Sequence, residues 1–174
     1  HTAIFGTVKA KRREGKKVIT TLLEHPSVLK HYETLAEYGY DVVYLKPDSD
    51  GKIDLAELSN AVDENTVLVS VMAVNNEVGS IQEFSKIKGI IKDKKSKAYF
   101  HCDAVQGFGK ITIKPKKFGI DLMSMSAHKI HGVKGAGALF VSNGIRILPH
   151  VFGGGQENGL ISGTEPMPAI CAFG

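Results

Sequence analysis

The sequence lacks several features that would place it in a specialised class of protein. It contains no tryptophan and only two cysteines, Cys102 and Cys171, among 174 residues. Two distant cysteines are too few for a disulfide framework and lack metal-ligand spacing, so we predict no metal site. No apolar run is long enough to cross a bilayer, and no basic segment followed by an apolar stretch marks a secretory signal. These absences predict a cytoplasmic protein without a membrane partner.

The chain also carries little excess charge. Its formal net charge is +4, and six of its basic residues fall between Lys9 and Lys17. A nucleic-acid-binding segment would interleave aromatic side chains with such a run, and none occurs in this one. We therefore interpret the run as a solvated surface and predict no nucleic-acid partner.

What the sequence does contain is the composition of an ordinary globular domain. Hydrophobic residues make up 43% and charged residues 23% of the chain, which is long enough for one domain with a substantial core. Apolar and polar stretches alternate in the manner of βαβ units, with no linker and no repeat. The predicted fold class is α/β: a mixed, mostly parallel sheet flanked by helices, in one domain over residues 1–174.

Apolar periodicity and turn residues predict the individual elements. Strands are expected at 17–21, 41–45, 66–72, 97–101, 121–125 and 135–142, and the last of these is the expected antiparallel strand. Helices are expected at 3–13, where Gly15 would stop the helix, and at 26–38, 55–62, 84–92 and beyond 169. The run at 66–72 is almost wholly apolar, which is typical of a parallel strand covered on both faces.

Lys129 is the most informative residue. It lies in the segment Ser-Ala-His-Lys-Ile-His-Gly (126–132), beside a glycine-rich stretch where backbone can approach a ligand closely. An isolated lysine is usually a surface residue, but a lysine amine in this setting can hold an aldehyde cofactor as a Schiff base. Pyridoxal phosphate is such a cofactor, and its ring nitrogen must stay protonated. Asp103 could supply the acidic partner, and its structural alternative is to cap a turn.

Polar residues follow four of the predicted strands. The carboxyl ends of parallel strands share one edge of a sheet, where open α/β proteins bind ligands. The side chains delivered to this edge are those of His25, Asn76, Asp103, Gln106, Ser126 and His128. Each of these residues could instead be a helix cap, a turn residue or a structural side chain. Polar residues at the ends of four strands nevertheless predict a cofactor site.

Chemistry suggests what each of these side chains would do there. His25 could stack on the cofactor ring and move protons near neutral pH. Gln106 and Asn76 could bind the phenolic oxygen of the ring, and Ser126 and His128 could bind the phosphate.

Three other residues are predicted to be structural on spacing alone. Thr164 is expected in a loop, Cys102 as a buried thiol at a strand end, and Cys171 as a packed residue of a helix.

Five segments carry a more specific resemblance. In order along the chain they are Glu-His-Pro-Ser-Val (24–28), Val-Asn-Asn-Glu-Val-Gly (74–79), His-Cys-Asp-Ala-Val-Gln (101–106), Ser-Ala-His-Lys (126–129) and Gly-Gly-Gly-Gln-Glu-Asn-Gly (153–159). Together they resemble the cysteine desulfurases, which belong to class V of the fold-type I pyridoxal phosphate enzymes. The resemblance covers essentially the whole chain and implies the central part of the large, cofactor-binding domain.

The resemblance implies two catalytic residues and one electrostatic partner. Lys129 would form the Schiff base with pyridoxal phosphate, and His25 would stack on the ring and shuttle protons. Asp103 would pair with the pyridine nitrogen.

The resemblance also implies the remaining cofactor-binding residues. Gln106 and Asn76 would bind the ring oxygen, and Ser126 and His128 would bind the phosphate. Thr164 would reach the phosphate of the other subunit, which makes a homodimer part of the site.

The implied reaction takes sulfur from L-cysteine and leaves alanine and a persulfide on an enzyme cysteine. The persulfide would feed iron–sulfur cluster assembly or thiolation, with a sulfur-acceptor protein as a partner of the full-length parent. The nearest alternatives are a selenocysteine lyase or another class V aminotransferase, and a non-catalytic truncated domain.

Three departures from the family pattern motivate the last of these alternatives. The family's phosphate-binding Gly-Ala-Thr-Glu segment would lie before His1, and its persulfide cysteine would lie after Gly174. Ile161 stands where the family usually has arginine. We therefore expect a fragment of a longer enzyme that does not turn over L-cysteine by itself.

Overall fold

One six-stranded sheet organises the structure, a computed structural model that describes residues His1 to Gly174. The strands are β1 (Lys17–Thr21), β2 (Asp41–Leu45), β3 (Thr66–Ser70), β4 (Tyr99–Asp103), β5 (Leu122–Ser126) and β6 (Gly137–Val141). Their order is β2-β1-β3-β4-β5-β6; the first five pair in parallel, and β6 is antiparallel to β5. The mixed, mostly parallel sheet predicted from the sequence is confirmed, as is its antiparallel strand.

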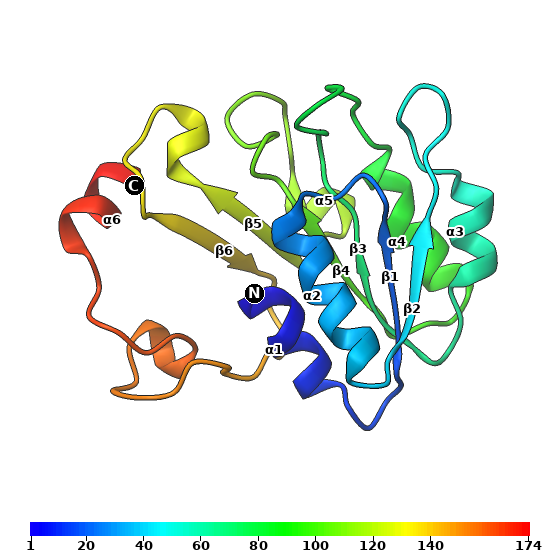
Figure 1. The fold of residues 1–174 in the computed structure, drawn as a ribbon, viewed down its shortest axis with the longest axis horizontal. Helices are drawn as coiled ribbons and strands as arrows, with labels where there is room; N and C mark the ends of the chain where they lie inside the picture. The colour runs from blue at the N-terminus through cyan, green and yellow to red at the C-terminus, as the bar shows by residue number, and fades with distance from the viewer.

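Helices cover both faces of the sheet (Figure 1). On one face lie α1 (Thr2–Ala10) and α2 (Pro26–Glu37), and on the other lie α3 (Leu55–Ala61), α4 (Phe84–Asp93) and the short α5 (Pro115–Phe118). The buried apolar residues accordingly form two main clusters, one beneath each layer of helices.

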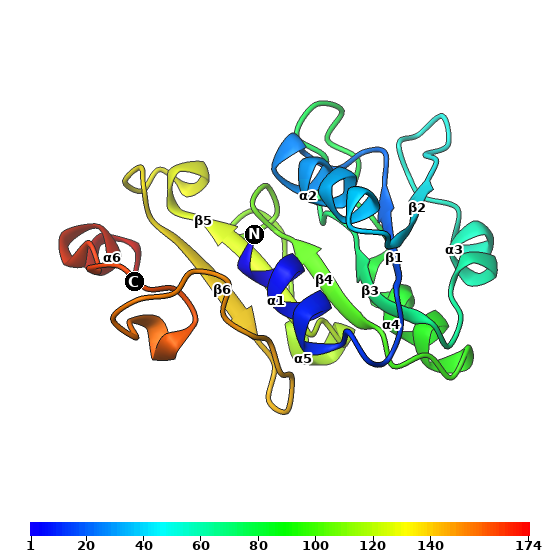
Figure 2. The ribbon, with the colours of Figure 1, turned by 60° about the horizontal axis from the view of Figure 1, so that its bottom comes forward.

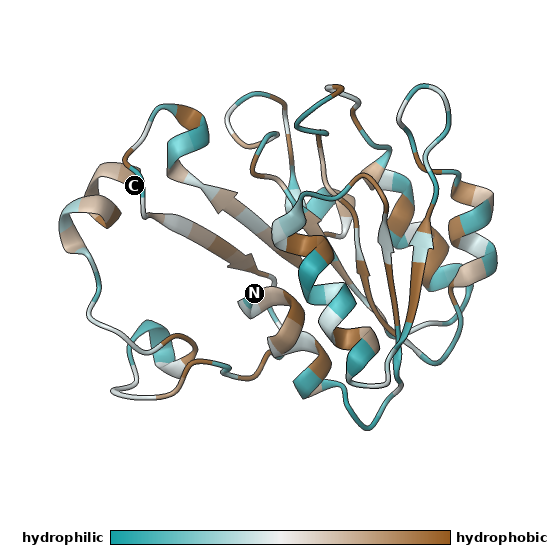
Figure 3. Ribbon diagram, viewed as in Figure 1, coloured by the Kyte–Doolittle hydropathy of each residue, from teal (hydrophilic) through white to brown (hydrophobic).

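The two clusters explain the apolar character of β3. Every residue of this strand is buried, with Leu68 in the cluster beneath α1 and α2 and Val69 in the cluster beneath α3 and α4. Successive side chains of a strand point to opposite faces, so a strand covered on both sides must be apolar throughout. Figure 3 shows the brown, hydrophobic stretches of the central strands, flanked by helices such as α2 and α3 on which teal and brown residues alternate.

Several predicted boundaries were wrong. Helix α1 ends at Ala10 rather than at residue 13, β3 ends at Ser70 rather than at residue 72, and β4 begins and ends two residues later than 97–101. Gly15 does not stop α1. A Cβ at Gly15 would lie 2.1 Å from the carbonyl oxygen of Asn65, so this glycine permits the close approach of two loops.

Three short helical segments were not predicted. They are α5 and the 3₁₀ helices η1 (Ala127–Ile130) and η2 (Glu157–Gly159). Segments of three or four residues are too short to show a helical period in the sequence. The helix expected beyond residue 169 is present as α6 (Met167–Phe173).

After β6 the chain leaves the sheet as an arm of residues 151–174, which carries η2 and α6 (Figures 1 and 2). A groove of about 1040 Å³ lies between this arm and strands β5 and β6. The arm exposes several large apolar side chains, namely Val151, Phe152, Ile161, Met167 and Ile170. None of the helices has both the length and the hydrophobicity that crossing a membrane requires.

Candidate cofactor site

The carboxyl ends of the parallel strands form one edge of the sheet, which we call the carboxyl edge. This edge opens between β1 and β3, because the chain runs from β1 to α2 on one face and from β3 to α4 on the other. Two buried side chains bridge the opening. Glu24 accepts a hydrogen bond from the backbone N–H of Met72, and Asn75 donates one from Nδ2 to the carbonyl oxygen of Leu23 at 2.9 Å.

Adjacent asparagines in the loop after β3 differ in what they can bind. Asn75 is buried, and its Oδ1 accepts hydrogen bonds from the backbone N–H groups of Glu77 and Val78, each at 2.9 Å. Asn76 is exposed, and its side chain bonds to no other residue of the chain. Asn75 therefore builds the loop, and Asn76 is the amide that is free for a ligand.

His25 is the N-cap of α2 and lies exposed at the carboxyl edge. Its Nδ1 accepts a hydrogen bond from the backbone N–H of Ser27 at 3.1 Å and lies 2.9 Å from the Ser27 hydroxyl. His25 therefore does cap the helix, as the structural alternative in the sequence analysis proposed. Both contacts use Nδ1, so Nε2 remains free to contact a ligand or to carry a proton.

Asp103 is buried at the last position of β4, not after the strand as predicted. One carboxylate oxygen accepts a hydrogen bond from the backbone N–H of Val105 at 2.9 Å, and the other has no partner within the chain. Burial raises the pKa of Asp103, while the Val105 N–H and the nearby His25 act in the opposite direction. The free oxygen makes Asp103 a strong acceptor for a protonated ligand group.

Gln106 lies in the turn that follows β4. Its Oε1 accepts a hydrogen bond from Lys110 at 2.8 Å, which leaves its amide nitrogen free to donate. This turn packs against the end of β3, because a Cβ at Gly107 would lie only 3.1 Å from the Cβ of Ala73. The loops after β3 and β4 are therefore in contact at the carboxyl edge.

Lys129 lies in η1, directly after β5. Ahead of it, the hydroxyl of Ser126 is 2.7 Å from Nδ1 of His128, so these two predicted phosphate donors contact each other. Lys129 itself is exposed and makes no hydrogen bond or ion pair within the chain. Its amine is therefore available for reaction.

A buried polar chain beneath the site was not predicted from the sequence. The Tyr32 hydroxyl donates to Oγ of Ser70 at 2.7 Å, Ser70 Oγ lies 3.0 Å from Nδ1 of His101, and Nε2 of His101 lies 2.8 Å from Oγ of Ser124. These side chains cross β3, β4 and β5 on the face that carries α2. Polar residues at matching positions of three otherwise apolar strands were the signal that could have revealed the chain.

Burial lowers the pKa of His101 to about 3, so its imidazole is neutral at physiological pH. A neutral ring has one donor and one acceptor nitrogen, which matches a hydroxyl on each side. The chain thus ties together the strands that end in Asp103 and Ser126, and it does so two residues below Asp103.

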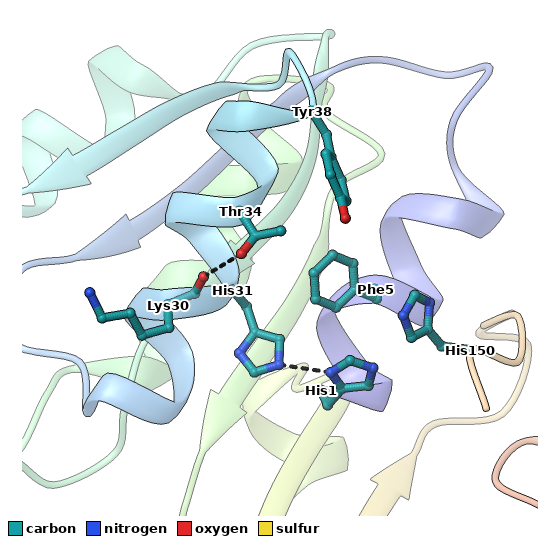
Figure 4. Close-up of a pocket in the computed structure, with 7 residues that line it drawn as sticks. All are labelled: His1, Phe5, Lys30, His31, Thr34, Tyr38 and His150. Carbon is teal, nitrogen blue, oxygen red and sulfur yellow. Dashed lines mark hydrogen bonds between the residues drawn. The ribbon is translucent and has the colours of Figure 1, made fainter.

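Two hollows lie apart from these residues. A pocket of about 330 Å³ between α1 and α2 is lined by His1, His31 and His150 among others (Figure 4), and His1 Nδ1 lies 2.9 Å from His31 Nε2. The second is the groove beside the arm, which includes Thr164. Thr164 is exposed and bonds to none of the other predicted site residues. No group of three or more His, Cys, Asp or Glu side chains could hold a metal ion.

The family profile of the class-V aminotransferases matches residues 2–172. The chain belongs to this family. It is 48% identical to the mitosomal cysteine desulfurase of Trachipleistophora hominis, over 99% of this chain and 40% of that protein. It is 42% identical to the cysteine desulfurase IscS of Clostridium botulinum, over 99% of this chain and 43% of that protein.

Solved structures give the same assignment. A NifS-like protein matches with a TM-score of 0.95 and 41% identity, over 99% of this chain and 47% of that one. A structure described as SspA in complex with cysteine matches with a TM-score of 0.92 and 37% identity, over 99% of this chain and 50% of that one. The chain thus spans half or less of the length of these relatives.

Class-V aminotransferases and cysteine desulfurases depend on pyridoxal phosphate, so the cofactor predicted from the sequence is confirmed at the level of the family. The residues at the carboxyl edge fit this group. Lys129 offers an unpaired amine for an aldehyde, and the buried residue Asp103 offers a carboxylate oxygen without a partner for a protonated ring nitrogen.

The neutral His101 makes stability depend on pH. Its pKa is about 3 in the folded state and its ordinary value is 6.5, so only the unfolded chain takes up this proton between those values. Stability is therefore retained above about pH 6.5 and lost as pH falls, by up to about 1.4 kcal/mol per pH unit from this group. His101→Gln removes this dependence.

Urea unfolding of the wild type and His101→Gln at about pH 7 and about pH 5 measures the effect. The wild type should lose more stability than the variant between these two conditions. Equal losses would show that His101 is not held neutral by burial.

Proposed function

We propose that this chain is the cofactor-binding part of a pyridoxal-phosphate-dependent cysteine desulfurase. The observation that carries the proposal is the pairing of an unbonded Lys129 amine, directly after β5, with the buried Asp103 at the end of the neighbouring β4. Relatives that are named cysteine desulfurase and are 42% and 48% identical over 99% of the chain support it.

In this proposal three residues act on the reactive part of the cofactor. Lys129 would bind the aldehyde carbon through Nζ, and Asp103 would keep the ring nitrogen protonated through its free oxygen. His25 would lie against the ring and use Nε2 to give or take a proton. The bound cofactor supplies an electron sink that weakens the bonds at the substrate's α-carbon.

The remaining predicted residues would hold the cofactor in place. The free amide nitrogen of Gln106 and the side chain of Asn76 would bind the ring oxygen. Ser126 and His128 would each exchange their mutual contact for a phosphate oxygen. An anion is the natural ligand for a hydroxyl and an imidazole that share one loop.

We propose L-cysteine as the substrate, with alanine and an enzyme-bound persulfide as products. One solved neighbour of 37% identity is described as a complex with cysteine. Cys102 is fully buried, and burial raises the pKa of its thiol, so it is not the nucleophile that takes the sulfur. Transfer from the persulfide to an acceptor protein, for iron–sulfur cluster assembly or thiolation, is part of the same proposal.

A homodimer would complete the site. Thr164 lies exposed on the arm, makes no hydrogen bond to its own carboxyl-edge residues, and would reach the phosphate of the partner subunit. The exposed apolar side chains of the arm support this assignment, with Phe152 71% and Met167 58% exposed. The cytoplasmic setting stays a prediction, since relatives include proteins named mitosomal and mitochondrial.

Replacement of Lys129 tests the cofactor chemistry. On addition of pyridoxal phosphate, the wild type should develop an absorbance band near the visible edge that borohydride removes. Lys129→Ala should not develop it. Lys134→Ala, which changes an exposed lysine of the same glycine-rich loop, is the matched control and should behave like the wild type. A band of equal strength in Lys129→Ala would overturn the assignment.

Product analysis tests the substrate. The full-length, cofactor-loaded protein should convert L-cysteine to alanine, with one sulfide released per alanine when a reductant is present. Addition of L-selenocysteine to a parallel sample separates desulfurase from selenocysteine lyase, because a lyase would release selenide and leave L-cysteine untouched. Transamination of L-cysteine without alanine formation would instead favour another class-V activity.

A further inference from the structure

Glu24 supplies a hydrogen-bond acceptor at the carboxyl edge, where the neighbouring strand β1 has ended. Beyond β3, the backbone N–H groups of Val71 and Ala73 continue the ladder with β4 and donate to carbonyl oxygens of that strand. Met72, between them, directs its N–H to the opposite side, where β1 has already ended. The Glu24 side chain turns back into this position and accepts that N–H. A backbone donor that would otherwise be buried without a partner is thus satisfied by a carboxyl group.

The whole carboxyl group of Glu24 is buried, although only one of its oxygens accepts the Met72 N–H. Its side chain is only 4% exposed, and its second oxygen, Oε2, is buried and has no hydrogen-bond partner. An ionised carboxylate with one oxygen in that condition is strongly disfavoured, because neither water nor a donor stabilises its charge. A protonated acid avoids this cost.

No lysine or arginine forms an ion pair with Glu24, so no positive side chain offsets a negative charge on its carboxyl group. The ionisable groups that act on it or feel it are Asp103 and Cys102 at the end of β4 and Tyr32 of α2, all of which are acids. Burial and the negative charge of Asp103 together raise the pKa of Glu24 to about 8, although the N–H of Met72 opposes them. Repulsion of this kind disfavours a second negative charge on the pair of buried carboxyl groups.

The two carboxyl groups are not equivalent. The Val105 N–H, His25 and the His1 amine all act to lower the pKa of Asp103 against the effect of its burial, whereas Glu24 has only the Met72 N–H. The charge is therefore placed on Asp103 and the proton on Glu24.

We propose that Glu24 is a positioning residue that stays protonated at neutral pH and thereby reserves the buried negative charge of the carboxyl edge for Asp103. The role toward the cofactor rests on the proposed function, since Asp103 would direct that charge to the ring nitrogen. Glu24 itself touches neither cofactor nor substrate. It acts through Asp103 and through the loop that carries His25.

The proposal fixes the sign of a pH effect. The ordinary pKa of the Glu24 carboxyl is 4.5 and its folded value is about 8, so the folded chain keeps a proton that the unfolded chain releases between these values. The folding equilibrium constant of the wild type therefore falls as pH rises through this window, by up to about tenfold per pH unit from this group. Glu24→Gln, which keeps a neutral acceptor for Met72, lacks this loss.

The test combines two measurements on the cofactor-free full-length protein. Infrared difference spectra between about pH 6.5 and about pH 9.5 should show the carbonyl band of a protonated carboxylic acid that disappears at high pH. Glu24→Gln should lack this band, and Glu37→Gln, at an exposed position of α2, should keep it. Urea unfolding should show the ratio of folding constants, variant to wild type, rising about a hundredfold over two pH units within the window.

A third measurement links the acid to the cofactor. In the loaded protein, Glu24→Gln should keep the absorbance band of the lysine-bound cofactor at neutral pH and should lack the change in the band that the ionisation of Glu24 causes in the wild type at higher pH. A purely structural role would instead weaken the band at every pH.

Each outcome decides the matter. A missing acid band, a band that survives in Glu24→Gln, or a constant folding ratio would show that Glu24 is not the protonated acid and would overturn the proposal. If the acid band is present but the wild type never forms the lysine-bound cofactor, the proposed function fails while the protonation of Glu24 stands.

Discussion

Parallel hydrogen bonding among β3, β4 and β5 is the constraint on which the site depends. It brings the ends of these strands to one edge and sets Asp103 in register with Ser124, two residues before Ser126. The buried chain from Tyr32 to Ser124 reinforces that register from below. Lys129 follows within one turn of η1, so the position of its backbone is determined by the pairing of the strands rather than by a long loop.

The second constraint is electrostatic. The region beneath the carboxyl edge is poor in positive charge, and its buried groups are held neutral where they can be: His101 by loss of a proton and Glu24 by retention of one. Asp103 is left as the charged group, and its second carboxylate oxygen has no partner within the chain. With the other buried groups neutral, a positively charged ligand group is favoured beside Asp103.

Much of this could be predicted from residue types and spacing. The apolar run of β3 predicted a strand covered on both faces, and the glycine-rich sequence beside Lys129 indicated a ligand-binding loop. The strand β4 was placed two residues early, because Cys102 and Asp103 have polar or reactive side chains that suggested the end of the strand. In the structure their backbone continues the ladder, and neighbouring strands satisfy or bury the side chains.

Other features depend on tertiary contacts that no local pattern reports. Asn75 and Asn76 are alike in sequence, and only the bond from Asn75 to Leu23 shows which of them is structural. Cys171 was expected to pack in a helix, and it does lie in α6, but it is exposed because that helix stands away from the sheet. Glu24 belongs to the Glu-His-Pro-Ser-Val segment, but nothing in that segment indicated its role, since the role arises from the end of a strand distant in sequence.

The central claim is that the sheet places Asp103 to hold a proton on the ring nitrogen of a cofactor bound to Lys129. Nitrogen NMR of the protein loaded with pyridoxal phosphate labelled at that nitrogen tests this directly. The chemical shift should be that of a protonated pyridine in the wild type and of an unprotonated one in Asp103→Asn. The same shift in both proteins would contradict the account.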